Sequence, residues 1–551
     1  MNSQEEAVGI SQFANPDILR FTGYLKKRYA DFVVDEVDLD GKVAELTDVL
    51  IEDSAKPAVT EEPSEALDQD LGKLLKEELG DMIEDALVKD IMMLEEEPGE
   101  PVLSKSIPEK SDRTRFHSAI RKVFNGRLVT DTVDDRVRIM SKGTDPKRTK
   151  VDRRNFQDPN RLPMVKFVLW KEFMETLEAV QIIARKIGIN PKDISYAGTK
   201  DRRAVTSQFV TIRHVNPAKI AGCNGAASGK IKISNARAVK EALSLGDLSG
   251  NRFTLLLRQV TASEDSSIRA ALESLSTKGF INYYGLQRFG SMSVKSHDIG
   301  IQLLQGKWQE AIDLILGPRD DESDGMAREA RRCWADQKDA KAAHDLFPFR
   351  YNAERQILWH FHKQANHNDL VGALLSVNRE LRLMYVHSVQ SLVWNRAVSE
   401  RVKKFGLVRP IVGDLVMGEG IPPTLVTQNN IDQFSIYDVV LPLPGYDIKK
   451  PSGDLGVLYN KVLSEEFHLV SQDCFQPKSK ALWDLPGAYR YIMAKPKSLQ
   501  YSIGYYDGVN SDVAELKQNG GEFKAVRVSF ELPTSSYATM AIREVMEVLL
   551  H

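Results

Sequence analysis

The sequence predicts an α+β protein: a sheet covered by helices, with a second and more helical domain inserted into it. Segments with strand and helix periodicity alternate between residues 165 and 279, longer helical runs fill about 305–495, and a strand followed by a helix returns at the C-terminus. A chain of 551 residues is also too long for one ordinary hydrophobic core. Two domains are therefore expected.

The first elements of the sheet are predicted from the strand-like VKFVLWKE, which begins at Val165, and from the helical METLEAVQIIARKIG that follows. Gly188 is placed to end this helix. The residues expected on its buried face are Leu177, Val180, Ala184 and Ile187. A short strand at 194–196 leads into a loop, and the alternating patterns of QFVTIRHV and GNRFTLLLR predict two further strands.

The next helix is predicted from SIRAALESLSTKG, which ends at Gly279. Its apolar stripe is Ile268, Ala271, Leu272 and Leu275. RELRLMYVHSVQSLVWNRAVSERV predicts a long helix in the inserted region, where turns such as PLPGYDIKKPSGD separate the helical runs. Near the end, KAVRVSFELP predicts a strand and SSYATMAIREVMEVLL a helix. The strand is expected to place on one face Val526, Val528, Phe530 and Leu532.

Charge is distributed unevenly along the chain. Residues 31–100 hold 24 acidic and 5 basic side chains, a net charge of −19, and because the formal total is −3 the remainder carries +16. A basic body of this kind is typical of a protein that binds a polyanion. For any single basic patch, the alternative to a polyanion-binding site is an ordinary solvated surface with charges of both signs.

The acidic residues belong to an insert over about 38–100, whose composition favours a solvated or poorly ordered segment. Within it, LGKLLKEELGDMIEDALVKDIMM predicts an amphipathic helix that could pack on the body, with the stripe Leu71, Leu74, Leu75, Leu79, Ile83 and Leu87. Residues 101–160 hold 15 basic and 8 acidic side chains and predict a segment that faces RNA. Deletion of residues 43–100 is expected to leave folding and turnover intact.

Motifs that the sequence lacks disfavour several functional classes. Cys223, Cys333 and Cys474 lie far apart and the ten histidines are scattered, so neither a disulfide framework nor a metal centre is predicted. No glycine motif for a phosphate or a dinucleotide is present, so no cofactor is expected. No apolar run could cross a bilayer and no secretory signal is recognisable, which predicts a soluble intracellular protein without a membrane partner.

The stretch YAGTKDRRAVTSQ, residues 196–208, sets one carboxylate among cations on a loop between two strands. Gly198 is expected to permit a turn that other residues disfavour. Neighbouring cations favour the ionised form of Asp201, and a carboxylate can serve as a nucleophile or a base. A plain surface turn is the alternative, since G-T-K-D is a common turn composition.

Two later segments mix aromatic side chains with groups that bind base edges and phosphates. They are GNRF, with Asn251 and Phe253, and NYYGLQRFG, which begins at Asn282. An enzyme that modifies a base in folded RNA must expose that base and stack it on an aromatic ring. Packing of the aromatic residues in the core is the alternative.

In this order and at this spacing, YAGTKDRRAVTSQ, GNRF and NYYGLQRFG resemble the motifs of the TruD family of pseudouridine synthases, including its eukaryotic members. KKRYADFVVDE near the start, YVHSVQSLVWN and LPGYD in the inserted region and FELPTSSYAT near the end add to the resemblance. It covers most of the chain outside the two inserts. Where the family commonly has N-Y-F-G this chain has N-Y-Y-G, so Tyr284 is expected to be a core aromatic.

The resemblance implies a V-shaped molecule in which a pseudouridine synthase catalytic domain with a mixed sheet is interrupted by an α/β TRUD insertion domain, with RNA in a central cleft. The expected segments are the N-terminal part of the catalytic domain (1–37), the acidic insert (38–100), the basic insert (101–160), the catalytic domain (161–304), the TRUD insertion domain (305–495) and the C-terminal return to the catalytic domain (496–551).

The resemblance also implies roles for individual residues. Asp201 matches the catalytic aspartate, and Phe253 matches the residue that stacks on the target base. The other residues expected at the substrate are Lys26, Phe32, Glu36, Lys200, Arg202, Asn251, Asn282, Gln287, Arg288 and Phe289. Lys27 is an alternative to Lys26, because the two adjoin.

The implied activity is isomerisation of uridine to pseudouridine: the glycosidic bond breaks and the base is re-attached through C5, without a cofactor or a metal. Asp201 would either attack the ribose C1′ or remove the C2′ proton. The expected substrates are tRNA, U2 small nuclear RNA and messenger RNA, and the protein is expected to be a monomer in the nucleus and cytoplasm. The alternatives are a non-catalytic RNA-binding protein or chaperone, and a metal-dependent nuclease that uses Asp201 with Glu36.

Overall fold

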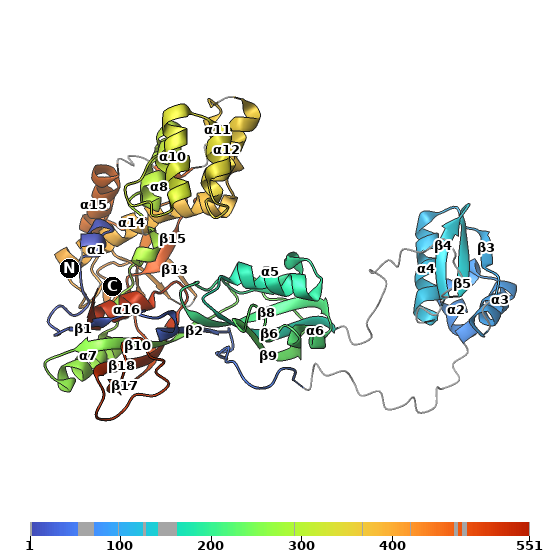
Figure 1. Ribbon diagram of the computed structural model, residues 1–551, viewed down its shortest axis with the longest axis horizontal. Helices are drawn as coiled ribbons and strands as arrows, with labels where there is room; N and C mark the ends of the chain where they lie inside the picture. Colours follow the sequence, from blue (N-terminus) through green and yellow to red (C-terminus); the bar gives the residue numbers. More distant parts are fainter. Residues whose placement is uncertain are drawn as a thin grey trace. The chain divides into compact units, whose positions relative to one another are not determined.

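The computed structural model describes residues 3–52, 71–96, 99–124, 128–141, 162–290, 292–365, 367–418, 420–467, 472–476 and 482–549. They fall into two compact units (Figure 1). The first unit is Met1–Ile51, Met164–Arg213 and Ala218–His551, and the second unit is Glu52–Pro163 with His214–Pro217. A large mixed sheet together with many helices confirms the predicted α+β class. None of the described helices is long and apolar enough to cross a membrane.

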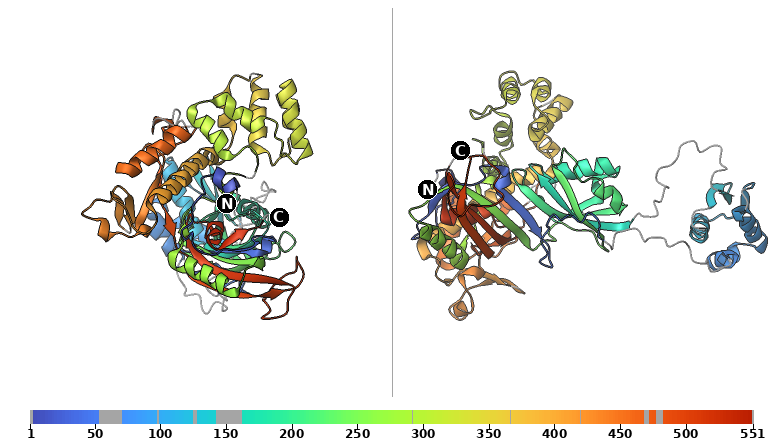
Figure 2. Two further views of the ribbon diagram at one scale, coloured as in Figure 1. Left: turned by 90° about the vertical axis from the view of Figure 1, so that its left-hand side faces the viewer. Right: turned by 60° about the horizontal axis from the view of Figure 1, so that its bottom comes forward.

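Ten strands form one sheet, whose main path runs β17-β18-β10-β2-β8-β6-β9. The strands of this path are β17 (Lys497–Tyr506), β18 (Phe523–Pro533), β10 (Gly250–Thr261), β2 (Phe32–Val37), β8 (Val205–Val215), β6 (Leu162–Glu172) and β9 (Ile231–Ala238). The strands that join beside it are β1 (Phe21–Tyr24), β7 (Ile194–Tyr196) and β19 (Met546–Val548). Figure 2 shows the red C-terminal strands in one sheet with strands from the first half of the chain.

The sheet is mixed because β2 pairs parallel with β8, whereas β10 pairs antiparallel with both β2 and β18. On β18 the predicted inward residues are all buried, which confirms the strand and its face: Val526, Val528, Phe530 and Leu532. Strand β18, near the C-terminus, therefore lies in the same sheet as β10 and β2.

Two predicted helices form beside these strands. Helix α7 (Asp265–Lys278) buries its whole predicted stripe and ends at Gly279. Helix α5 (Thr176–Ile187) ends at Gly188, which adopts a φ of 79°, but Leu177 is 48% exposed and its predicted place on the buried face was wrong. The buried residues follow helical spacing from the first residue of the helix instead: Thr176, Ala179, Val180, Ile183 and Ala184.

The C-terminal helix is shorter than predicted. Helix α16 ends at Val545, and Met546–Val548 forms strand β19. This strand pairs parallel with β1, so that Phe21 lies opposite Met546. Pairing with a distant strand overrides the helical periodicity of the last residues.

A helical region lies between β10 and β17 in the chain. Its helices are α8 (Ser296–Gln305), α9 (Trp308–Leu316), α10 (Gly325–Gln337), α11 (Ala340–Leu346), α12 (Asn352–Gln364), α13 (Leu370–Ser376), α14 (Arg379–Phe405) and α15 (Gly453–Lys461). A small sheet, β13-β12-β14-β15, comprises β12 (Leu415–Gly418), β13 (Ile421–Leu425), β14 (Val439–Leu443) and β15 (Ala488–Tyr491). The region shares one hydrophobic core with the large sheet, and its boundaries at 305 and 495 stay a prediction.

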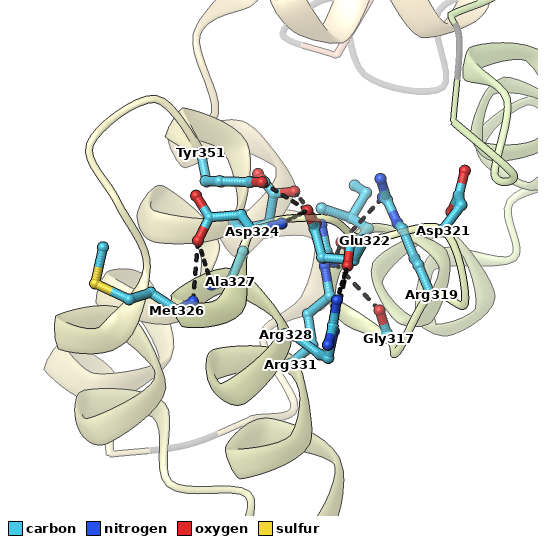
Figure 3. A network of polar contacts seen from close by, with 12 residues as sticks. Gly317, Arg319, Asp321, Glu322, Asp324, Met326, Ala327, Arg328, Arg331 and Tyr351 are labelled. Atoms are coloured by element: carbon cyan, nitrogen blue, oxygen red, sulfur yellow. Dashed lines mark hydrogen bonds and ion pairs between the residues drawn. The ribbon is translucent and has the colours of Figure 1, made fainter.

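Buried charges hold helices α9, α10 and α12 together (Figure 3). Arg331 is fully buried and donates to the Ile315 carbonyl at 2.6 Å and to Glu354 Oε1 at 2.8 Å. Glu322 pairs with Arg331 Nε at 3.4 Å and accepts a hydrogen bond from the Tyr351 hydroxyl at 2.9 Å. Each buried charge thus has a partner of opposite sign, which such burial requires.

The second unit has its own small core. It contains α2 (Leu71–Leu79), α3 (Asp85–Glu96), β3 (Val102–Ser106), α4 (Lys110–Val123), β4 (Leu128–Val133) and β5 (Arg136–Ser141), with the strand order β3-β5-β4. Of the predicted stripe, Leu75, Leu79 and Ile83 are buried here. They pack in one cluster with Phe116 and Ile120 of α4.

The second unit differs from the two inserts that charge alone predicts. The boundary expected at residue 100 falls inside this unit, and Leu75, Leu79 and Ile83 of the stripe pack in the unit's own core. The single amphipathic helix is two helices, because the chain turns at Gly80–Met82. Residues 53–70 and the basic run PKRTKVDRR at 146–154 lie outside the described residues.

Candidate active site

A pocket of about 280 Å³ lies where β2, β10, the loop before β8 and the segment before α16 meet. We call residues 197–204 the Asp201 loop. The lining residues are Lys26, Phe32, Val34, Gly198, Thr199, Lys200, Asp201, Leu248, Asn251, Phe253, Gln287, Thr534, Ser535, Ser536, Tyr537, Ala538 and Thr539. Most predicted substrate residues thus gather here from segments far apart in the sequence.

The register of the sheet explains why GNRF meets the N-terminal strand. Asn251 lies opposite Glu36, and Phe253 lies opposite Val34. Because side chains two residues apart on a strand point to the same face, Asn251 and Phe253 face the pocket together. Gly250 is required by the neighbouring strand, since a Cβ there would lie 2.2 Å from the carbonyl oxygen of Leu532.

Lys200 is the centre of a polar triad with Asn251, which lines the pocket as Lys200 does, and with Glu36, which does not. Its Nζ lies 2.8 Å from Glu36 Oε2 and donates to Asn251 Oδ1 at 2.8 Å. Glu36 is only 1% exposed, and its Oε1 accepts the N–H of Phe209 at 3.2 Å. The ammonium and the amide group therefore offset the charge of Glu36, and this carboxylate does not reach the pocket.

Hydrogen bonds to the main chain hold the Asp201 loop. Thr176 Oγ1 accepts the N–H of Lys200 at 2.9 Å and donates to Gln208 Oε1 at 2.8 Å, and Gln208 Nε2 donates to the Gly198 carbonyl at 2.9 Å. The predicted need for glycine at 198 was wrong, because its φ is not positive and a Cβ would meet no atom within 4 Å. Asp201 itself is exposed and lines the pocket.

Aromatic rings form another wall. Phe253 and Phe32 pack edge to face with ring centroids 6.0 Å apart, and Phe530 lies behind Phe253 at 5.9 Å. The Lys26 Nζ lies 3.7 Å from the centre of the Phe32 ring, whereas Lys27 bonds outside the pocket. The structure therefore places Lys26 rather than Lys27 here.

Lys26 has an unusual environment for a lysine. Its backbone φ of 57° lies in the left-handed region, which residues other than glycine rarely adopt. Burial lowers the pKa of its ammonium group, the nearby charge of Arg203 lowers it further, and the carboxylate of Asp201 opposes both. The pocket thus holds a desolvated cation and a carboxylate close enough to interact.

Sequence reasoning missed Tyr537, which also lines the pocket. Burial raises the pKa of its phenol, while the positive charges of Arg288 and Arg490 oppose that rise. The ring packs edge to face on Tyr284 at 6.1 Å. The motif FELPTSSYAT contains this residue, but the strand pattern beside it does not indicate which way Tyr537 points.

The second signature, NYYGLQRFG, divides between the pocket and the core. Gln287 lines the pocket, but Asn282, Arg288 and Phe289 do not. The Arg490 guanidinium donates to Asn282 Oδ1 at 3.0 Å and to its carbonyl at 2.8 Å, and Phe289 is 1% exposed. The remaining members of the sequence-based set also lie outside the lining: Arg202, which stacks on Phe173 with its Cζ 5.2 Å from the ring centre, and the buried Glu36.

The lining suits a nucleotide. An aromatic wall can stack on a base, Asn251 and Gln287 can bond base edges or ribose, and the lysines can attract phosphate. Within the described ranges, no three His, Cys, Asp or Glu side chains gather at a spacing that would hold a metal ion.

Several known proteins are similar to this chain in sequence, and a solved structure is similar to it in fold. A family model described as tRNA pseudouridine synthase D (TruD) matches residues 146–545. The human pseudouridylate synthase 7 homolog is 34% identical over 99% of this chain and 81% of its own length. The multisubstrate pseudouridine synthase 7 of Schizosaccharomyces pombe is 32% identical over 98% of this chain and 90% of its own length.

A crystal structure of a protein assigned as tRNA pseudouridine synthase D (TruD) from Methanosarcina mazei superposes with a TM-score of 0.60. It covers 100% of this chain and 98% of that protein at 22% identity, which supports the fold. Fold and sequence together define an RNA-modifying isomerase of the pseudouridine synthase class. The chain belongs to the TruD family of that class.

Proposed function

We propose that this pseudouridine synthase uses Asp201 as its catalytic group. One observation carries the proposal: among the described residues that line the pocket, Asp201 is the carboxylate, and the neighbouring Glu36 is held behind the wall by Lys200. Asp201 is exposed on a loop whose main chain is fixed, so a substrate can reach it without unfolding the site.

The proposed chemistry isomerises one nucleotide without adding or removing an atom. Asp201 attacks C1′ or removes the C2′ proton, and the bond between C1′ and N1 breaks. The freed uracil rotates within the pocket, a bond forms between C5 and C1′, and the proton on C5 leaves while N1 gains one. A positioned carboxylate and a base held against escape are sufficient for these steps.

The other pocket residues hold the substrate in this proposal. Phe253 stacks on the target base, with Phe32 supporting it from the side. Lys26 attracts the phosphates, and Asn251 and Gln287 bond the base or ribose. Asn282, Arg288 and Phe289 act indirectly, because they shape the segment around Gln287 and Tyr537 without lining the pocket.

The nuclease alternative requires Asp201 and Glu36 to share a metal ion. The structure gives this arrangement little support, since Lys200 Nζ lies 2.8 Å from Glu36 and would have to be displaced. A non-catalytic role is disfavoured by membership of a family of enzymes.

We further propose that the substrates are uridines in tRNA, U2 small nuclear RNA and messenger RNA, with the protein active as a monomer in the nucleus and cytoplasm. The family description names tRNA, and the name of the fission-yeast relative says multisubstrate. The basic remainder of the chain would attract any of these RNAs through their phosphates.

The test is to incubate the purified protein with transcripts of the three RNA classes and to map pseudouridine by carbodiimide modification. We expect defined sites in tRNA and in at least one of the other classes. Unmodified tRNA alongside a modified messenger or small nuclear RNA would contradict the tRNA assignment. A protein that modifies none of them would contradict the proposed substrates altogether.

A further inference from the structure

A lysine that the proposed chemistry does not use lies directly under the Asp201 loop. Lys171, near the end of β6, is 0% exposed. Its Nζ donates to the carbonyl of Met174 at 2.6 Å, to that of Lys200 at 3.2 Å and to that of Asp201 at 3.5 Å. One buried ammonium therefore joins the β6–α5 connection to the main chain of the residue proposed to react.

The rest of this connection, residues 172–176, also contacts the Asp201 loop. Phe173 donates its N–H to the Ala204 carbonyl at 3.1 Å and packs its ring against Arg202. The backbone of Phe173 has a φ of 47°, a strained value for a residue with a Cβ. With the bond from Lys200 to Thr176, contacts therefore reach residues 200, 201, 202 and 204.

The charges around Lys171 come from both sides of this contact. Asp201 and Lys200 lie on the loop, and Glu175 and Glu178 lie at the start of α5. The pKa of Lys171 is lowered to about 8: burial is the largest cause, the charge of Lys200 adds to the decrease, and the three carboxylates, Asp201 first, oppose it. A buried ammonium is costly unless it is hydrogen-bonded and its charge is offset, and among the carboxylates that act on Lys171 the largest influence is that of Asp201.

We propose that Lys171 is a positioning residue for pseudouridine formation: its ammonium clamps the Asp201 loop and sets a positive charge beneath the reacting carboxylate. The inference rests on the proposed role of Asp201. Lys171 does not line the pocket and touches no substrate, so its effect should fall on kcat and leave RNA affinity nearly unchanged. Misplacement of a reacting group by about 1 Å costs roughly 100-fold in rate.

Deprotonation gives the proposal a signature in pH. As the pH rises through about 8, Lys171 becomes neutral, its bonds to the carbonyls weaken, and kcat should fall. Fold stability moves the other way: an unfolded lysine titrates near about 10.4, so between the two values the unfolded state binds more protons and stability from this residue rises with pH. A fall in kcat above pH 8 therefore cannot be explained by a loss of fold stability caused by deprotonation of Lys171.

The experiment compares wild type, Lys171→Met and Lys171→Arg in single-turnover assays from about pH 6.5 to 9.5, with thermal melting and RNA binding on the same samples. Lys232→Met is the control, because Lys232 is an exposed lysine on β9, paired opposite Trp170. Lys171→Met should lower kcat by about 10- to 100-fold at pH 7 with RNA affinity within about twofold. Lys171→Arg should keep part of the activity and abolish the decline above pH 8, because arginine stays charged.

A Lys171→Met enzyme within about twofold of wild type would overturn the inference, and so would a Lys171→Arg enzyme that keeps the decline above pH 8. If Lys171→Met does not fold, the test is the difference between the pH profiles of wild type and Lys171→Arg. Ionisation of the uracil at high pH lowers both profiles equally, so a difference between them reports on residue 171. Asp201→Asn is measured beside them. Activity in that variant contradicts the proposed function, whereas an inactive Asp201→Asn with an unaffected Lys171→Met contradicts only the role of Lys171.

Discussion

Among the individual residues, the two acidic side chains of the site, Glu36 and Asp201, differ in their environment. Glu36 is buried against Lys200, and Asp201 is open to the pocket. Glu36→Gln would leave the Lys200 ammonium without its partner, and loss of one member of a buried pair costs about 3–5 kcal/mol. We expect Glu36→Gln to lower the free energy of unfolding by that amount, measured by urea denaturation.

Addition of Lys200→Met should recover part of this loss, because no unpaired charge then remains. The exposed pair Lys341–Asp345 provides the control, since Lys341→Met should cost less than about 0.5 kcal/mol. Additive effects of Glu36→Gln and Lys200→Met would contradict the coupling that the structure implies.

Substitution of Phe253 tests whether the aromatic wall of the pocket stacks on the base. Stacking of a base on an aromatic side chain is worth about 1–3 kcal/mol, so Phe253→Leu should lower kcat/KM by roughly 5- to 150-fold. Phe530→Leu removes the same volume from the ring 5.9 Å behind it, outside the pocket, and should cost stability but little activity. Equal losses of kcat/KM in the two variants would show that only packing matters.

Among the elements, the pairing of β10 with β18 depends on a glycine. Gly250→Ala would place a Cβ 2.2 Å from the Leu532 carbonyl oxygen, so the strands must separate and the melting temperature should fall by several degrees. Gly198→Ala meets no atom within 4 Å and should melt within the error of wild type. The comparison is made by differential scanning fluorimetry, and an unchanged Gly250→Ala would be inconsistent with the strand register.

Periodicity predicts an element well where one face is buried along its whole length. The stripe of α7 and the inward face of β18 follow directly from the sequence for this reason. Leu177 and β19 could not be predicted in this way, because helix start and long-range strand pairing decide them. Periodicity is likewise silent on which of Lys26 and Lys27 enters the pocket.

The residues of the site likewise divide into those that the sequence predicts and those that it does not. The motifs point to Asp201, Asn251 and Phe253, because a reactive loop and a strand of alternating side chains are visible in the sequence. Tyr537 and Lys171 were missed. The position of Tyr537 depends on contacts with residues far away in the sequence, such as Tyr284, and that of Lys171 depends on the β6–α5 connection. Asn282, Arg288 and Phe289 sit close to Gln287 in sequence, yet only Gln287 lines the pocket.

For the whole molecule, the second unit changes the expected effect of a deletion. Removal of residues 43–100 would take α2 and α3 away from the core formed with Phe116 and Ile120. We therefore expect that variant to aggregate, contrary to the expectation from composition. Removal of residues 53–161 together, with a short Gly/Ser linker, should leave the first unit folded.

Soluble yield and melting temperature of the two deletions check this prediction. A soluble, cooperatively melting variant without 43–100 would contradict the shared core. Aggregation of the complete deletion would show instead that the first unit requires the second.

The central claim is that Asp201 performs the isomerisation, and it is tested most directly by release of tritium from a tRNA transcript labelled at uridine C5. Wild type and Asp193→Asn should release tritium at the same rate, because Asp193 is an exposed aspartate outside the pocket. Asp201→Asn should release none while it melts like wild type and binds the transcript at least as tightly, since one negative charge has been removed. Release of tritium by Asp201→Asn at a rate near that of wild type would contradict the account.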